Sequence, residues 1–215
     1  MEMSITLAIV IITAVISFTA FSNQKIQEDL IFYPPAVDRR RQWYRFITSG
    51  FIHANFFHLF FNMWALYSFG TMVEDALNQI FGPAGRIYYL LLYISALVVS
   101  LLPTYFNNRD NYHYRSLGAS GAVSAVVFAG ILFFPLNEIG IFPLPFGIPG
   151  FIFGALYLII SSYLSRRGMD NINHSAHLWG SVYGFIYVIA ICALFSSYPP
   201  IQAFIQQVQS YHFGK

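Results

Sequence analysis

Charged side chains are scarce in this chain of 215 residues: 11 are basic and 9 are acidic, which is 9% of the sequence. Soluble domains usually carry about 25% charged residues, so a water-soluble globular enzyme is nearly excluded. The net charge is only +2 and the longest basic run is three residues, 39–41, so we expect no nucleic acid partner. The single cysteine, Cys192, cannot form an internal disulfide, which excludes a disulfide framework.

Hydrophobic residues, by contrast, make up 57% of the chain, and the mean hydropathy is +0.57. The apolar runs are long and continuous rather than alternating. Since every backbone polar group in hydrocarbon needs an internal partner, such runs predict membrane-spanning helices. We therefore predict an all-α integral membrane protein in the lipid bilayer. Its six transmembrane helices are expected at about residues 5–21, 56–73, 87–102, 117–134, 150–164 and 176–195.

The connection over residues 23–55 mixes charged residues with apolar ones such as Trp43 and Tyr44. This amphipathic composition predicts a structured loop in the membrane interface. Residues 1–21 lack a basic start and end in a poor cleavage site, so we expect a retained first span rather than a signal peptide. No internal repeat is evident, and residues 1–215 are expected to form one domain.

The basic residues are unevenly divided between the two sides that six spans would create. The side with both termini holds only Arg86 and Lys215, whereas the other side holds nine basic residues. Taken alone, the positive-inside rule favours both termini outside the cell.

Several polar residues lie where hydrocarbon should exclude them, and each is a functional hypothesis by default. His58 and Asn62 are four residues apart near the start of the second span, so they share one helix face. Interhelical hydrogen bonding, worth about 0.6 kcal/mol per contact, is the alternative explanation.

Ser120 lies at the start of the fourth span, in the sequence Gly-Ala-Ser-Gly. The flanking glycines could simply permit close helix packing. In the functional interpretation, Ser120 lies at a helix N-terminus, where free backbone N–H groups point towards a developing anion. The motif differs from the Gly-x-Ser-x-Gly elbow of soluble hydrolases.

His177 opens the sixth span, and Gly180 and Gly184 follow it on the same face. The glycines would let a neighbouring helix approach the imidazole; tight packing around a satisfied histidine is the alternative. A metal site would have to recruit His174 and His177 with another histidine. No carboxylate or thiolate accompanies them, so we expect neither a metal nor a cofactor.

Together these residues suggest one site. A candidate nucleophile (Ser120), a candidate base (His177) and two hydrogen-bond donors (His58 and Asn62) lie near the N-termini of the second, fourth and sixth spans. Alternating topology places these three ends on one side of the membrane. Such a convergence is what an acyl-transfer site requires.

Across essentially its whole length the sequence resembles the rhomboid intramembrane serine proteases of the minimal six-helix type. The family's three ordered motifs and two further matches are found at His53, His58 and Asn62; at Gly118, Ser120 and Gly121; at Ala176, His177, Gly180 and Gly184; and at Arg45 and Glu74.

The resemblance implies a Ser120–His177 dyad with no acidic third member. His58, Asn62 and the Ser120 backbone N–H would form the oxyanion hole, and Gly118 would shape the approach to it. Structural roles around the site would fall to His53, Arg45, Glu74, Gly121, Gly180 and Gly184. Substrates would be transmembrane proteins, cut in or near their membrane segment after a small residue, at a site open to water.

The resemblance also implies a cytoplasmic N-terminus and an active site near the outer face. We expect this topology despite the charge count, because five of the nine basic residues belong to a loop that folds into the membrane surface. The absence of a transit peptide or soluble domain favours a prokaryotic cell membrane.

Three positions depart from the family pattern. Ser124 replaces an aromatic residue four positions after the nucleophile, Phe128 replaces a glycine eight positions after it, and Tyr44 directly precedes Arg45. These departures leave the dyad intact, but they put in question how His177 is oriented and how tightly the fourth and sixth helices pack.

Two rival functions are a catalytically inactive rhomboid relative that binds membrane proteins, and a small transporter with polar residues along a pathway. The presence of both Ser120 and His177 argues against the first. The lack of buried carboxylates and of repeat symmetry argues against the second.

Overall fold

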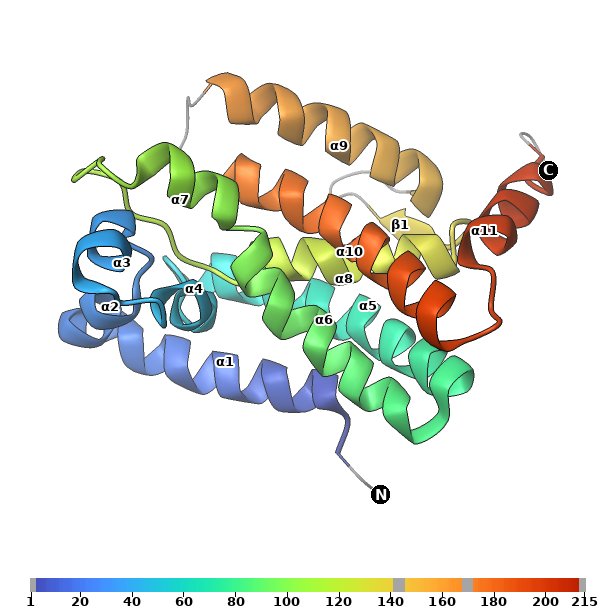
Figure 1. Cartoon of the computed structure of the whole chain (residues 1–215), viewed down its shortest axis with the longest axis horizontal. Helices are drawn as coiled ribbons and strands as arrows, with labels where there is room; N and C mark the ends of the chain where they lie inside the picture. The colour runs from blue at the N-terminus through green and yellow to red at the C-terminus, as the bar shows by residue number, and fades with distance from the viewer. Residues whose placement is uncertain (1–2, 141–145, 168–171, 213–215) are drawn as a thin grey trace.

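The computed structural model describes residues 3–140, 146–167 and 172–212. The chain is mostly helical (Figure 1). The longer helices are α1 (Ile5–Phe21), α5 (Phe56–Phe81), α6 (Gly85–Val99), α8 (Ser120–Phe133), α9 (Gly150–Arg167), α10 (His174–Phe195) and α11 (Pro200–Gln209). The shorter ones are α2 (Gln24–Leu30), α3 (Pro34–Arg40), α4 (Arg45–Thr48), α7 (Leu102–Asn108) and the 3₁₀ turns η1 (Ser49–Phe51) and η2 (Gly82–Ala84).

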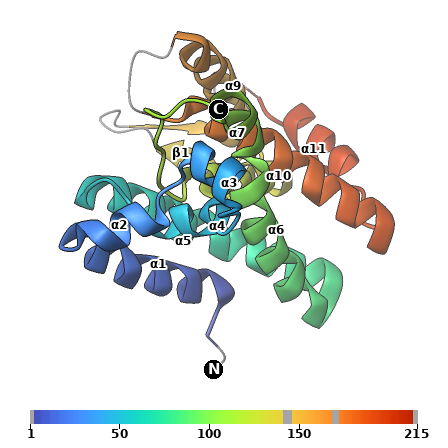
Figure 2. The ribbon, with the colours of Figure 1, turned by 60° about the vertical axis from the view of Figure 1, so that its left-hand side comes forward.

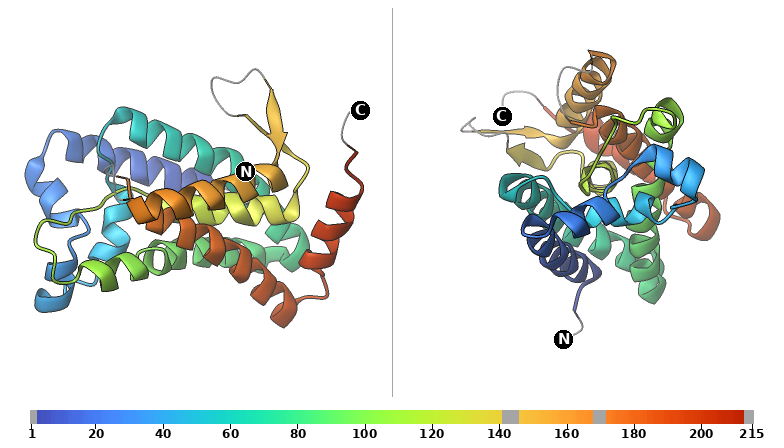
Figure 3. Two further views of the ribbon diagram at one scale, coloured as in Figure 1. Left: turned by 90° about the horizontal axis from the view of Figure 1, so that it is seen from above. Right: turned by 90° about the vertical axis from the view of Figure 1, so that its left-hand side faces the viewer.

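Helix α8 lies at the centre of the molecule, with α5, α6, α9 and α10 around it (Figure 3). All of its residues are buried except Ser120 and Val127, which are partly exposed. Its small side chains and Gly121 and Gly130 let the neighbouring helices approach closely, as in other packed apolar bundles. The start of α8 is therefore the point at which a buried helix emerges towards accessible space.

A helix covers most of each predicted span, but several boundaries differ. Helix α5 continues eight residues past the predicted end at 73, because Val73, Ala76 and Leu77 keep its buried face apolar beyond Glu74. Helix α8 begins at Ser120 rather than at 117. Gly118 has a φ of +114°, which no helical residue adopts, so the helix cannot include it.

Three features were not predicted. Helix α11 follows the last predicted span, and α7 extends α6 beyond a short break before Pro103. Strands β1 (Glu138–Gly140) and β2 (Gly147–Pro149) pair antiparallel, with Glu138 opposite Pro149.

The connection 23–55 is structured, as predicted: it contains α2, α3, α4 and η1. Phe32, Val37 and Phe46 of this connection are buried together with Leu101 and Tyr105. It lies at the same end of the molecule as α7 (Figures 1 and 2), whereas the start of α1, helix α11 and the turn between α5 and α6 lie at the other end (Figure 1).

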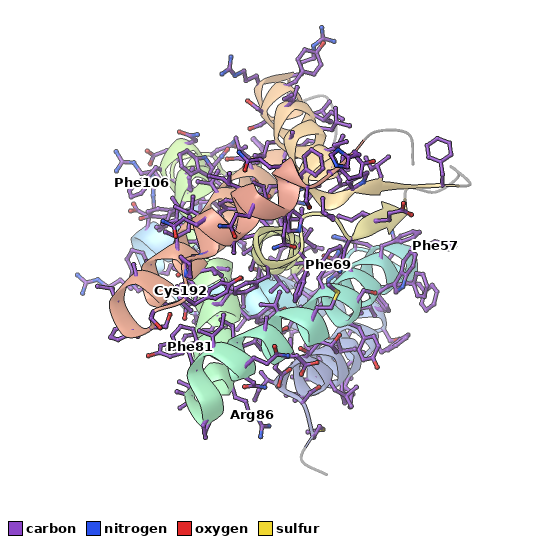
Figure 4. All side chains as sticks on the ribbon, turned by 90° about the vertical axis from the view of Figure 1, so that its right-hand side faces the viewer. Phe57, Phe69, Phe81, Arg86, Phe106 and Cys192 are labelled. Atoms are coloured by element: carbon purple, nitrogen blue, oxygen red, sulfur yellow. The ribbon has the colours of Figure 1, made fainter. Side chains whose placement is uncertain are left out.

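By length and composition, two helical stretches of the described residues could cross a membrane: Phe56–Asn108, which includes a turn, and His174–Phe195. Helices α1 and α8 are apolar but shorter. Large hydrophobic side chains are exposed along several helices, most densely on α5, where they are Phe56, Phe57, Phe60, Phe61, Trp64 and Tyr67. Phe57 extends from the outer side of α5 (Figure 4).

Candidate active site

Ser120 and His177 are in direct contact. The Nε2 atom of His177 lies 2.8 Å from the Oγ atom of Ser120, within hydrogen-bond distance. Ser120 is the first residue of α8, and His177 lies in the first turn of α10. A hydroxyl paired with an imidazole nitrogen at this distance has the geometry in which the imidazole can remove the hydroxyl proton.

Close packing of α8 against α10 makes this contact possible. A Cβ atom at Gly180 would overlap the backbone carbonyl oxygen of Gly121, and one at Gly184 would overlap that of Ala125. Gly121 in turn lies against the side chain of Ser100 at the end of α6. The glycines that the sequence places beside His177 thus form a backbone-to-backbone contact between the two helices.

Asn173, which the sequence analysis missed, fixes the start of α10. Its Oδ1 atom accepts hydrogen bonds from the Ala176 N–H at 3.0 Å and from the Thr104 hydroxyl at 3.1 Å. Its Nδ2 atom donates to Ser116 Oγ at 3.3 Å. The preference of asparagine for helix N-caps could have revealed the capping role, although not the links to α7 and to the segment before α8.

His58 lies beside the backbone that leads into Ser120. Its Nδ1 atom accepts a hydrogen bond from the Ala54 N–H at 3.4 Å, which assigns the proton of the neutral ring to Nε2. A Cβ atom at Gly118 would lie 2.9 Å from that Nε2 atom. The absence of a side chain at Gly118 therefore lets the Nε2–H donor approach this backbone.

Asn62 lies one turn further along α5, and it lines the same cavity as Ser120. Its Nδ2 atom donates to the His58 carbonyl oxygen at 2.9 Å. A side-chain amide carries two N–H donors, so one hydrogen bond to its own helix still leaves a second donor for a ligand.

His53 is buried beneath the site and connects three segments. Its Nε2 atom accepts from the Ala119 N–H at 3.4 Å, and its Nδ1 atom lies 2.9 Å from Ser17 Oγ of α1. The Ser17 hydroxyl donates to the Phe51 carbonyl oxygen. Burial, and secondarily the nearby His58 imidazole, lower the pKa of His53 to about 3. His53 is therefore a neutral support for the residue that precedes Ser120.

Arg45 organises the connection 23–55. Its Nη1 atom donates to the carbonyl oxygens of Glu28 at 2.8 Å and Ile31 at 2.7 Å, and its Nε atom donates to Gln42. These bonds satisfy the end of α2 and hold it against α4.

Glu74 lies away from the site, although the sequence led us to expect it among the structural residues near the site. Its carboxylate accepts hydrogen bonds from the Ile5 and Thr6 backbone N–H groups, at 2.8 and 2.9 Å, and from the Thr6 hydroxyl. A carboxylate in this place satisfies free N–H groups at the N-terminus of α1. Glu74 lies more than three helical turns beyond Asn62 along α5, so its structural role is at the opposite end of the molecule.

A cavity of about 610 Å³ leads to Ser120 between α5 and α9, with α8 as its floor. Asn62, Phe69, Ser124 and Tyr157 are among its lining residues, which are mostly apolar. Figure 4 shows Phe69 of α5 beside the central helix. Across the described residues, no three His, Cys, Asp or Glu side chains lie together in a way that could hold a metal ion.

Tyr157 of α9 is a second residue that the sequence analysis missed. Its hydroxyl lies 2.8 Å from the Ser124 hydroxyl, and its ring is stacked beside the imidazole of His177. A tyrosine in an apolar helix, 37 positions after Ser120, gives no sequence signal of this contact.

Comparison with known proteins agrees with the resemblance. The family model described as the rhomboid domain matches residues 40–194. The human presenilin-associated rhomboid-like protein, mitochondrial, is 32% identical over 148 residues, which cover 66% of this chain and 36% of that protein. The chain thus spans about a third of the length of this relative.

Two further relatives come from other lineages. The protein YdcA of Bacillus subtilis (strain 168), whose name classes it with rhomboid proteases, is 30% identical over 147 residues, 67% of this chain and 65% of its own. Rhomboid-like protein 15 of Arabidopsis thaliana is 27% identical over 194 residues, 85% of this chain and 44% of its own. Since the family model covers well over half of the sequence, the chain belongs to the rhomboid family.

Proposed function

We propose that this protein is an intramembrane serine endopeptidase in which Ser120 is the nucleophile and His177 the general base. The observation that carries the proposal is the 2.8 Å contact between His177 Nε2 and Ser120 Oγ at the end of the cavity. Membership of a family that consists generally of intramembrane serine proteases supports it.

In this reaction Ser120 Oγ attacks the scissile carbonyl carbon while His177 Nε2 takes the hydroxyl proton. The C–N bond then breaks as the imidazolium returns a proton to the leaving amine, which leaves an acyl group on Ser120. A water molecule, deprotonated by the same imidazole, hydrolyses the ester and restores the hydroxyl.

The oxyanion of each tetrahedral intermediate needs hydrogen-bond donors placed in advance. The candidates are the Nε2–H of His58, the second Nδ2–H of Asn62 and the backbone N–H of Ser120. Gly118 supports this assignment because its missing side chain leaves His58 close to the backbone before Ser120.

The substrates that suit this site are transmembrane proteins, cut in or near their membrane segment after a small residue. The apolar lining of the cavity between α5 and α9 supports this class, since it is suited to a hydrophobic segment and ends at Ser120. Rhomboid proteins act on membrane proteins, which gives the same expectation.

We propose further that residues 1–215 form one domain in which α1, α5, α6, α8, α9 and α10 span the bilayer. The large apolar side chains exposed on these helices are suited to lipid contact. The connection 23–55 would lie in the membrane interface. Relatives are found both in mitochondria and in a bacterium, and the bacterial one supports a prokaryotic cell membrane as the location.

Labelling with a fluorophosphonate probe tests the function. Covalent labelling of the detergent-solubilised protein that is lost in Ser120→Ala is the expected result, together with cleavage of a transmembrane substrate. A folded protein that neither labels nor cleaves would overturn the proposal in favour of an inactive, membrane-protein-binding relative or a small transporter.

A further inference from the structure

Helix α9 supplies an aromatic ring to the candidate dyad. The rings of Tyr157 and His177 have centroids 6.3 Å apart and planes inclined by only 24°, which is a stacked arrangement. Offset-stacked aromatic pairs are favourable at centroid distances of about 4.5–7 Å. The Tyr157 ring therefore lies along one face of the imidazole whose Nε2 atom contacts Ser120.

The Tyr157 ring is itself held in place from several sides. Its hydroxyl is hydrogen-bonded to Ser124 Oγ at 2.8 Å. Phe153, one turn earlier on α9, stacks on it at 5.7 Å, and Phe128 of α8 packs against it at 5.7 Å. A side chain fixed at both its ring and its hydroxyl can hold a neighbouring ring in place.

Ser124 connects this contact to the nucleophile. It lies four residues after Ser120 on α8, so both side chains project from the same face of one helix. Ser124 is also the position at which the family resemblance leads one to expect an aromatic residue. Here a small hydroxyl occupies that place in α8, and the aromatic ring that stacks on His177 comes from α9 instead.

We propose that Tyr157 is a positioning residue for His177: its ring face restricts rotation of the imidazole and keeps Nε2 directed at Ser120 Oγ. This inference rests on the proposed protease function. Small misplacements of a catalytic group cost large factors in rate, so a ring that limits imidazole rotation increases the productive fraction of the dyad. Tyr157 also makes the orientation of His177 depend on the position of α9 relative to α8 and α10.

Two substitutions separate the ring from the hydroxyl. Tyr157→Met keeps an adaptable apolar side chain of similar length but removes the ring. We expect it to slow fluorophosphonate labelling of Ser120 about 3- to 10-fold, which corresponds to the strength of an aromatic pair. Tyr157→Phe keeps the stacking and should label within about twofold of the wild-type rate. Tyr163→Met is the matched control, because Tyr163 lies on the exposed side of the same helix.

The final extent of labelling distinguishes positioning from a merely structural role. A positioning residue changes the rate at which Ser120 reacts while the final labelled fraction stays that of a folded protein. Should Tyr157→Met not fold in detergent, Tyr157→Leu carries the same comparison. For a transmembrane substrate, the same change should lower kcat.

Three results would overturn the inference: a wild-type labelling rate in Tyr157→Met, a slow rate in Tyr157→Phe equal to that of Tyr157→Met, or a reduced labelled fraction at an unchanged rate. Absence of labelling in the wild-type protein would overturn the proposed function itself, and the role of Tyr157 with it.

Discussion

Gly180 of α10 lies directly against the backbone carbonyl oxygen of Gly121, the residue that follows Ser120 in α8. One turn earlier on α10, His177 reaches Ser120 across the same contact. The geometry of the candidate dyad is therefore set by how closely two helix backbones approach each other.

Gly180→Ala tests this dependence. The added Cβ would overlap backbone atoms, which cannot move aside as a flexible side chain can, so α8 and α10 must separate. We expect a loss of about 1–3 kcal/mol in stability and a labelling rate of Ser120 at least about tenfold lower, since small displacements of catalytic groups are costly.

Thermal unfolding in detergent and labelling kinetics measure the two effects. Gly140→Ala is the control, because a Cβ there meets no atom of the described residues within 4 Å. Equal behaviour of the two variants would contradict the packing argument.

The sequence predicts this contact well because glycine spacing on one helix face has a direct geometric meaning. It also predicts helical runs over all six intervals, since continuous apolar stretches leave the backbone few alternatives. It could not predict α11 or the β1–β2 pair, which are short elements stabilised by contacts with the bundle, such as the bond from Gln207 Nε2 to the Phe133 carbonyl oxygen. The misplacement of Glu74 has a similar cause, because its position along α5 is visible in the sequence but its partner in α1 is not.

Within the candidate site, the sequence pointed to the residues with distinctive chemistry and missed those that support them through tertiary contacts. Ser120, His177, His58 and Asn62 are polar groups in apolar surroundings, so each is conspicuous. Tyr157 and Asn173 are not, because a tyrosine in an apolar helix and an asparagine in a loop are ordinary until the tertiary structure shows their neighbours.

The oxyanion donors give a second prediction. His58→Ala and Asn62→Ala should each lower turnover about 100- to 1000-fold, as loss of one such donor typically does. Both proteins should remain folded, with Ser120 still accessible to the probe. Thr71→Ala serves as the control on the same helix, because the Thr71 hydroxyl bonds to the Tyr67 carbonyl of its own helix. Wild-type turnover in both variants would leave His58 and Asn62 with packing roles alone.

His53 predicts a dependence of stability on pH. Its pKa is about 3 in the folded protein and about 6.5 when unfolded, so between these values the unfolded chain binds the proton and the folded one does not. The contribution of His53 to the free energy of unfolding is therefore fully present above about pH 6.5 and is lost as the pH falls. The loss amounts to about 2 kcal/mol at pH 5. Thermal unfolding between pH 7.5 and 5 measures the loss, and His53→Gln should reduce the slope. The same slope in His53→Gln would rule out this origin.

The orientation in the membrane gives a fourth prediction. With the family topology, a reporter fused at Lys215 reads cytoplasmic. A cysteine introduced at position 108 in a Cys192→Ser background reacts with an impermeant maleimide from outside the cell. Cys192 is the single cysteine of the chain, so this background carries no other thiol that could react. The opposite pattern would mean that the nine basic residues at this end of the molecule determine the topology.

The most direct measurement compares Ser120→Ala, His177→Ala and the double variant in cleavage of a transmembrane substrate by purified protein. Ser120→Ala removes the attacking oxygen, whereas His177→Ala leaves it without a base. Residues that act as one unit give non-additive losses. We therefore predict that each single variant loses nearly all activity, that the double variant is hardly worse, and that thermal stability changes only modestly. Substantial cleavage by either single variant, in a preparation free of other proteases, would contradict the assignment of Ser120 and His177 as the catalytic dyad.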